Sequence, residues 1–146
     1  MTIRDLQKSI AASLGAVEAL AKGGCKVFAE DMLTTQNDLN NAVATAGRIA
    51  VVVTTPRFER DASGCDGGIP AGCELRVACI EAPSQRGRRD GFTALDAAEA
   101  VAHALDSAEI EWRSIEQTAD ARTGTVTASA TFGFNPILTE PTTERN

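Results

Sequence analysis

The clearest fold signal in this chain lies in the stretch Cys73-Glu-Leu-Arg-Val-Ala-Cys-Ile-Glu-Ala-Pro83, continued by Ser84-Gln-Arg-Gly-Arg-Arg-Asp-Gly91 and Phe92-Thr-Ala-Leu-Asp-Ala-Ala-Glu-Ala-Val-Ala-His-Ala-Leu105. The first part alternates between apolar and polar residues, and this two-residue period predicts a strand up to Glu81. The second part is a short basic turn. The third part has the three- and four-residue spacing of an amphipathic helix. The stretch therefore predicts a strand, a basic loop and a helix.

The predicted strand and helix each have one apolar side. On the strand, Cys73, Leu75, Val77 and Cys79 share a face, with Glu74 and Arg76 on the other. The helix is expected over Thr93–Asp106, because Thr93 and Asp96 form a Thr-x-x-Asp start that satisfies amides at a helix N-terminus. Its inner face comprises Ala94, Ala98, Val101 and Leu105, with Leu95 and Ala102 beside them. Its polar edge comprises Asp96, Glu99, His103 and Asp106.

The residues before this unit predict two more helices and two more strands. Their bounds are Ile3–Ala21 and Gln36–Ala46 for the helices, and Cys25–Ala29 and Ile49–Val53 for the strands. Both helix starts repeat the Thr-x-x-Asp pattern, and Gly23-Gly24 stops the first helix. The continuous, mostly β-branched run at 49–53 is typical of an interior strand. The glycine-rich segment Arg57–Gly72 has no period and predicts a long loop.

A β-hairpin is predicted after the helix. Ile110 and Trp112 alternate inward, and Ile115 breaks the phase, which suggests a bulge near Ser114. The turn Asp120–Gly124 reverses the chain. An alternating strand then runs to Phe134, with Val126, Ala128, Ala130 and Phe132 on its apolar side. Residues 135–146 contain two prolines and predict an extended C-terminal arm.

Together these elements predict an α+β fold. We expect a single domain over residues 1–134, with about three helices packed on a four- to five-stranded, mostly antiparallel sheet, and an arm over residues 135–146. The 146 residues are 43% hydrophobic and 23% charged, which is ordinary for a globular domain. The apolar runs are too short to span a membrane, and the N-terminus lacks the pattern of a secretion signal, so synthesis in a cytoplasm is expected.

The charge disfavours one class of partner. Fourteen basic and twenty acidic side chains give a net charge of −6. Proteins that wrap nucleic acid need many Lys and Arg contacts to phosphate, so such binding is not expected. An acidic wall would instead let DNA slide past by repulsion.

The four cysteines, at positions 25, 65, 73 and 79, raise the hypothesis of a metal site. Zinc ligands usually come as closely spaced pairs, whereas these spacings are wide, and Cys73 and Cys79 share a face with Leu75 and Val77. Burial as small apolar side chains is therefore favoured. A disulfide between Cys65 and Cys73 is an alternative, although cytoplasmic synthesis argues against its early formation.

Catalytic patterns are weak. His103 is the only histidine, and helical phase places it with Glu99 and Asp106 on a solvated edge, opposite Val101 and Leu105. The chain has no Gly-x-Ser-x-Gly turn, and its glycine-rich segment lacks a phosphate-binding Gly-Lys-Ser/Thr ending. We therefore expect no enzymatic activity, no cofactor and no catalytic or metal-ligating residues. A small cytoplasmic enzyme or a metal- or ligand-binding domain using the Cys65–Cys79 region is the alternative of another class.

The strongest candidate for a contact between subunits is the basic turn. Arg86, Arg88 and Arg89 concentrate positive charge, and arginine favours carboxylates at interfaces. The candidate partners of these arginines are Asp96, Glu99 and Asp106 of a neighbouring copy. Arg57 and Arg60 of the predicted loop are candidates for further contacts between subunits. A merely solvated turn is the alternative.

The unit from Val77 through Gly87 to the helix start Thr93-Ala-Leu-Asp-Ala-Ala-Glu-Ala-Val resembles tail-terminator, or tail-completion, proteins of long-tailed bacteriophages. The likeness lies in the order of elements over most of residues 1–134. It implies a hexameric ring at the head-proximal end of the tail tube, which ends tube polymerisation and meets the head–tail connector while DNA passes through the lumen. It implies no catalytic residues, and a virion location after assembly in the host cytoplasm. A neck or head-completion protein fits the same likeness.

Overall fold

The computed structural model describes residues 3–29, 49–54, 56–60, 69–81, 92–107, 110–122, 124–134 and 137–138. The helices are α1 (Ile3–Gly15), α2 (Glu18–Lys22) and α4 (Ala94–Leu105). The strands are β1 (Cys25–Ala29), β2 (Ile49–Val53), β3 (Arg57–Arg60), β4 (Ile69–Glu81), β5 (Glu111–Ala119), β6 (Val126–Phe134) and β7 (Ile137–Leu138). The helix expected over 36–46 lies outside the described residues.

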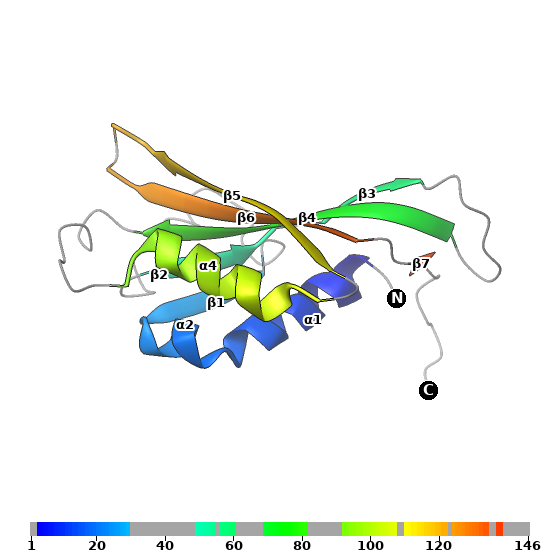
Figure 1. The fold of residues 1–146 in the computed structure, drawn as a ribbon, viewed down its shortest axis with the longest axis horizontal. Helices are drawn as coiled ribbons and strands as arrows, with labels where there is room; N and C mark the ends of the chain where they lie inside the picture. The colour runs from blue at the N-terminus through cyan, green and yellow to red at the C-terminus, as the bar shows by residue number, and fades with distance from the viewer. Residues whose placement is uncertain are drawn as a thin grey trace.

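The strands form one sheet with the helices on one of its faces (Figure 1). The main path is β1-β2-β4-β6-β5, in which β1 and β2 are parallel and the other neighbours are antiparallel. β3 and β7 pair with the first part of β4, which extends beyond the helices. The predicted α+β class is confirmed, and the five strands of the main path agree with the expected number.

The core lies between the helices and the central strands. All five residues of β2 are buried, as its continuous apolar run predicts. On β4 the alternation is also confirmed, because Leu75, Val77 and Cys79 are fully buried while Glu74 and Arg76 are exposed. This burial of β-branched and aliphatic side chains is the main source of stability.

Two carboxylates cap the start of α4, and one of them comes from the sheet. Thr93 and Asp96 form the predicted capping box, with the Thr93 N–H donating to Asp96 Oδ2 at 2.9 Å. Glu81, at the end of β4 and only 7% exposed, accepts the Ala94 N–H at 2.8 Å. Since the Thr93 hydroxyl also accepts the Asp96 N–H, three amides at the start of α4 are satisfied.

The predicted inner face of α4 is confirmed with one correction. Ala94, Ala98, Val101, Ala102 and Leu105 are buried. Leu95 was expected beside them but is 39% exposed, because Ala97 takes the place next to the sheet. The small alanine side chains let the helix approach the strands closely.

The first helix is two helices, which corrects the single helix expected over Ile3–Ala21. The chain leaves the helical path at Val17, whose backbone is extended, after two i→i−3 hydrogen bonds. This break allows Leu14 and Leu20 both to be 1% exposed. Gln7, also buried, donates from Nε2 to the Val53 carbonyl at 2.9 Å and joins α1 to β2.

The segment expected to be the loop Arg57–Gly72 is partly strand. Residues 57–60 form β3, and β4 begins at Ile69, with Phe58 opposite Cys73. The glycine-rich composition hid this pairing, because backbone hydrogen bonds between strands leave no local signature in the sequence. Phe58 of β3 packs against the core. Residues 61–68 lie outside the described ranges.

The β5–β6 hairpin is confirmed. Its register shifts between Trp112 and Ser114, which is the predicted bulge. At its turn, Gly124 has a φ of 76° and Asp120 accepts the Arg122 N–H at 2.9 Å. Ala128, Ala130 and Phe132 are fully buried as predicted.

Trp112 was expected inside and is 47% exposed. The alternation does place it on the helix-facing side, opposite the buried Phe132, but β5 is the last strand of the main path. An outer strand has fewer neighbours to cover its side chains. Within the expected C-terminal arm, Ile137–Leu138 form β7. No helix among the described residues is long and apolar enough to span a membrane.

Candidate functional site

The outer edge of α4 carries four polar side chains. Asp96, Glu99, His103 and Asp106 follow at steps of three and four residues, so they share one edge of the helix. All four are exposed, as the helical phase predicts.

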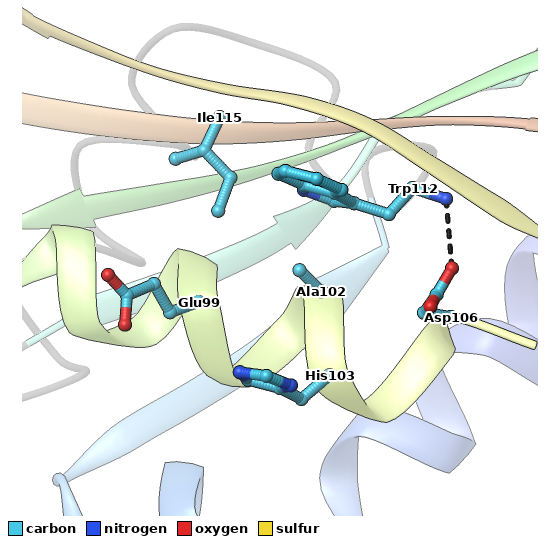
Figure 2. Close-up of a pocket in the computed structure, with 6 residues that line it drawn as sticks. All are labelled: Glu99, Ala102, His103, Asp106, Trp112 and Ile115. Atoms are coloured by element: carbon cyan, nitrogen blue, oxygen red, sulfur yellow. Dashed lines mark hydrogen bonds between the residues drawn. The ribbon is translucent and has the colours of Figure 1, made fainter.

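A hollow lies between this edge and β5 (Figure 2). Its volume is about 330 Å³, and its lining residues are Glu99, Ala102, His103, Asp106, Trp112 and Ile115. Trp112 and Ile115 extend from β5 toward α4, and Ala102 lies below the indole ring in this view. The hollow therefore combines an aromatic and aliphatic wall with two carboxylates.

The connection from α4 to β5 holds Trp112 in place. Asp106 follows α4 as its C-cap, and its Oδ1 accepts the backbone N–H of Trp112 at 3.1 Å. Ser107 Oγ accepts the Ile110 N–H at 3.1 Å, and the Ser107 N–H donates to the Ile110 carbonyl at 2.9 Å. These bonds join the end of α4 to the start of β5, so the backbone of Trp112 is fixed relative to the helix.

A second hollow lies on the other side of the polar edge. It has a volume of about 540 Å³, and its lining includes Val17 and Ala19 together with Phe92, Ala100 and Ala104. Asp96, Glu99 and His103 also border it. The polar edge of α4 is thus a ridge between two shallow, partly apolar depressions.

Two of the described cysteines, Cys73 and Cys79, are poor candidates for chemistry. Cys25, Cys73 and Cys79 are not in disulfide bonds. Burial, and secondarily the charge of Glu74, raises the pKa of Cys73 to about 12. Burial, with a smaller contribution from Cys25, raises the pKa of Cys79 to about 12. Because the thiolate is the nucleophile and the metal ligand, these protonated thiols are inert at neutral pH.

The structure places only part of the predicted metal and disulfide candidates. Cys65 lies outside the described residues, and Cys73 is not in a disulfide. Among the described residues, no group of three or more His, Cys, Asp and Glu side chains is arranged to hold a metal ion.

The acidic members of the predicted subunit contact are brought together, whereas most of its basic members lie outside the described residues. Asp96, Glu99 and Asp106 share the edge of α4. Arg57 lies on β3, in one cross-strand row with Glu74, Gly133 and Glu111, on the face opposite the helices. Arg60 is the last residue of β3. Arg86, Arg88 and Arg89 lie outside the described residues.

Arg57 already has an acidic partner. Its guanidinium forms an ion pair and hydrogen bond with Glu59, two residues along the same strand, and both side chains are exposed. The pair has no net charge, which weakens the case for Arg57 as an attractor of a neighbouring acidic edge.

Sequence reasoning missed Trp112 as a surface residue. The alternation of β5 is correct, but it cannot reveal that no further strand in the described part of the chain covers β5. The usable signal was the predicted bulge beside the only tryptophan of the chain, since bulges commonly redirect side chains near sites. Glu81 was also missed, although it continues the inward phase of Val77 and Cys79.

The chain was compared with known proteins. No protein-family model matches it, and no curated protein is significantly similar to it in sequence.

Proposed function

We propose that this chain is a structural virion protein that forms a ring, of about six copies by the family likeness, at the head-proximal end of a bacteriophage tail tube. In this role it ends tube polymerisation and presents a surface to the head–tail connector, while DNA passes through the lumen without specific binding. The observation that carries the proposal is the α4–β5 surface. There an exposed tryptophan stands beside an edge of acidic side chains, on the outside of a well-packed core.

Exposed tryptophan has a specific meaning on a protein surface. Tryptophan is strongly enriched among the few interface residues that contribute most to association, whereas charged residues usually form the rim around them. Trp112 with Glu99, His103 and Asp106 around it has this composition. The buried, protonated Cys73 and Cys79 disfavour the alternative of thiol or metal chemistry in the Cys65–Cys79 region.

A closed ring also needs two different, complementary patches on each subunit, because its interface is head-to-tail. The acidic and aromatic surface of α4 and β5 is one such patch. The sequence supplies a positively charged counterpart in Arg86, Arg88 and Arg89. The acidic balance of the whole chain suits a lumen past which DNA slides.

Assembly measurements test this function. The protein is purified alone and together with the tail tube protein encoded in the same genome, and its mass is measured by light scattering while the particles are imaged by electron microscopy. We expect rings that cap the tubes and limit their length. Tubes of unchanged length, with a monomeric protein in both samples, would contradict the proposal.

A further inference from the structure

The α4–β5 hollow has an unusual pairing of groups. Trp112 is 47% exposed although it is a large aromatic side chain. Glu99 and Asp106 line opposite ends of the hollow on the helix side, and the Glu99 carboxylate points away from the indole in this view (Figure 2). Ala102 and Ile115 supply an apolar lining between them. A ligand for this site should be flat and apolar over its surface but positively charged at its rim.

A guanidinium group meets these requirements. It is planar, it stacks on aromatic faces, and it donates paired hydrogen bonds to carboxylates. Asp106 accepts one hydrogen bond from the backbone N–H of Trp112. An ionised carboxylate accepts about four hydrogen bonds in all, so Asp106 can receive a guanidinium as well. A lysine ammonium would satisfy the charge but not the stacking.

The chain itself supplies suitable groups. Arg86, Arg88 and Arg89 lie in one stretch of four residues, although the protein as a whole has a net charge of −6. They precede Phe92 and the N-terminal end of α4, whereas Asp106 and Trp112 lie at its C-terminal end. The proposed ring needs a head-to-tail contact between copies, so we assign the arginine to another copy and not to the same one.

We propose that the hollow between α4 and β5 receives an arginine side chain from the segment Arg86–Arg89 of a second copy of this chain, with the guanidinium stacked on Trp112 and paired with Glu99 or Asp106. This assignment rests on the proposed ring function and defines its head-to-tail contact. Each copy offers the hollow on one side and inserts its own arginine into the next copy.

The single tryptophan makes this contact directly observable. Emission of Trp112 is recorded as the protein is diluted, and self-association is measured in parallel by light scattering. A hollow variant carries Glu99→Lys, and a basic-segment variant carries Arg86→Ala, Arg88→Ala and Arg89→Ala. The matched control is Glu116→Lys, which makes the same charge change on an exposed residue of β5 outside the hollow.

We expect each variant alone to associate at least about tenfold more weakly than the parent, and the control to associate normally. An equimolar mixture of the two variants should form a heterodimer that grows no further. In this mixture the intact arginines of the hollow variant meet the intact hollow of the basic-segment variant. Unchanged association of the Glu99→Lys protein, or a mixture that stays monomeric, would overturn the assignment. Trp112 emission that depends on the arginines but not on concentration would show occupancy within one copy and would also overturn it.

A peptide separates this assignment from the ring function. The peptide Ser84–Gly91 is titrated into the full chain, with a version carrying lysine for arginine as its control. Quenching of Trp112 by the arginine peptide supports the hollow even if the protein forms no ring. Absence of quenching at about 1 mM peptide, in a protein that does cap tubes, rejects the hollow and leaves the ring function standing.

Discussion

The two sides of α4 show how one helix can serve two purposes. Its inner side and its first turn are held by buried groups, including Ala98, Val101 and the Glu81 carboxylate. Its outer edge faces the hollow, where Trp112 remains half exposed. Changes on the inner side should therefore lower the free energy of unfolding, and changes on the outer edge should alter recognition with little effect on stability.

The largest effect is expected at Glu81. Replacement by alanine removes the acceptor for the Ala94 N–H and leaves this amide buried, since Ala94 is fully buried. We expect Glu81→Ala to lower the free energy of unfolding by about 2–3 kcal/mol. Urea denaturation followed by circular dichroism measures this change. Glu81→Gln keeps an acceptor oxygen and should cost clearly less; equal losses for both variants would mean that packing, not the hydrogen bond, holds the start of α4.

Gly23 gives the next largest effect. The ring of Phe92 lies so close to Gly23 that an added Cβ would collide with it. Gly23→Ala must therefore displace the residue next to the start of α4, at a cost of about 1–3 kcal/mol in unfolding free energy. Gly15→Ala is the matched control, because its Cβ meets nothing within 4 Å and alanine favours the helix. Thermal unfolding should separate the two variants, and equal melting temperatures would refute the close approach.

Alkaline pH should lower the stability of the core that the inner side of α4 covers. Burial raises the pKa values of Cys73 and Cys79 to about 12, above the ordinary value of 9.0. The unfolded chain then loses these protons at lower pH than the folded chain. Their stabilising contribution is complete below pH 9 and is lost as the pH rises from 9 toward 12.

The double variant Cys73→Ala and Cys79→Ala checks this expectation. Its unfolding free energy should decline less between pH 9 and pH 11 than that of the parent, even if it is less stable at pH 7 because of the cavities. A parallel decline of both proteins would assign the alkaline loss to other groups.

The difference between the two sides also explains what the sequence could predict. Burial on β2 and β4 and the capping box of α4 depend on neighbours within a few residues, so the patterns predict them correctly. The break at Val17, the strand β3 and the exposure of Trp112 depend on which distant segments lie alongside. Such tertiary contacts override local patterns.

The candidate site divides in the same way. The polar edge of Asp96, Glu99, His103 and Asp106 follows from helical phase and was predicted in full. Its neighbour Trp112 comes from another element, and the hydrogen bond to Asp106 and the register shift of β5 bring the indole to that edge. A pattern within one helix cannot reveal a wall supplied by a strand.

The smallest effect on stability is expected at Asp106, where the outer edge meets Trp112. Asp106→Asn keeps an oxygen that can accept the Trp112 N–H but removes the charge. Since both residues are exposed, the unfolding free energy should change by less than about 1 kcal/mol. The emission maximum of the dilute monomer should also stay the same, because the backbone bond still positions the indole. Asp106→Ala removes that bond and should shift the emission at equal stability; if asparagine shifts it as much as alanine does, the charge, and not the bond, sets the surroundings of Trp112.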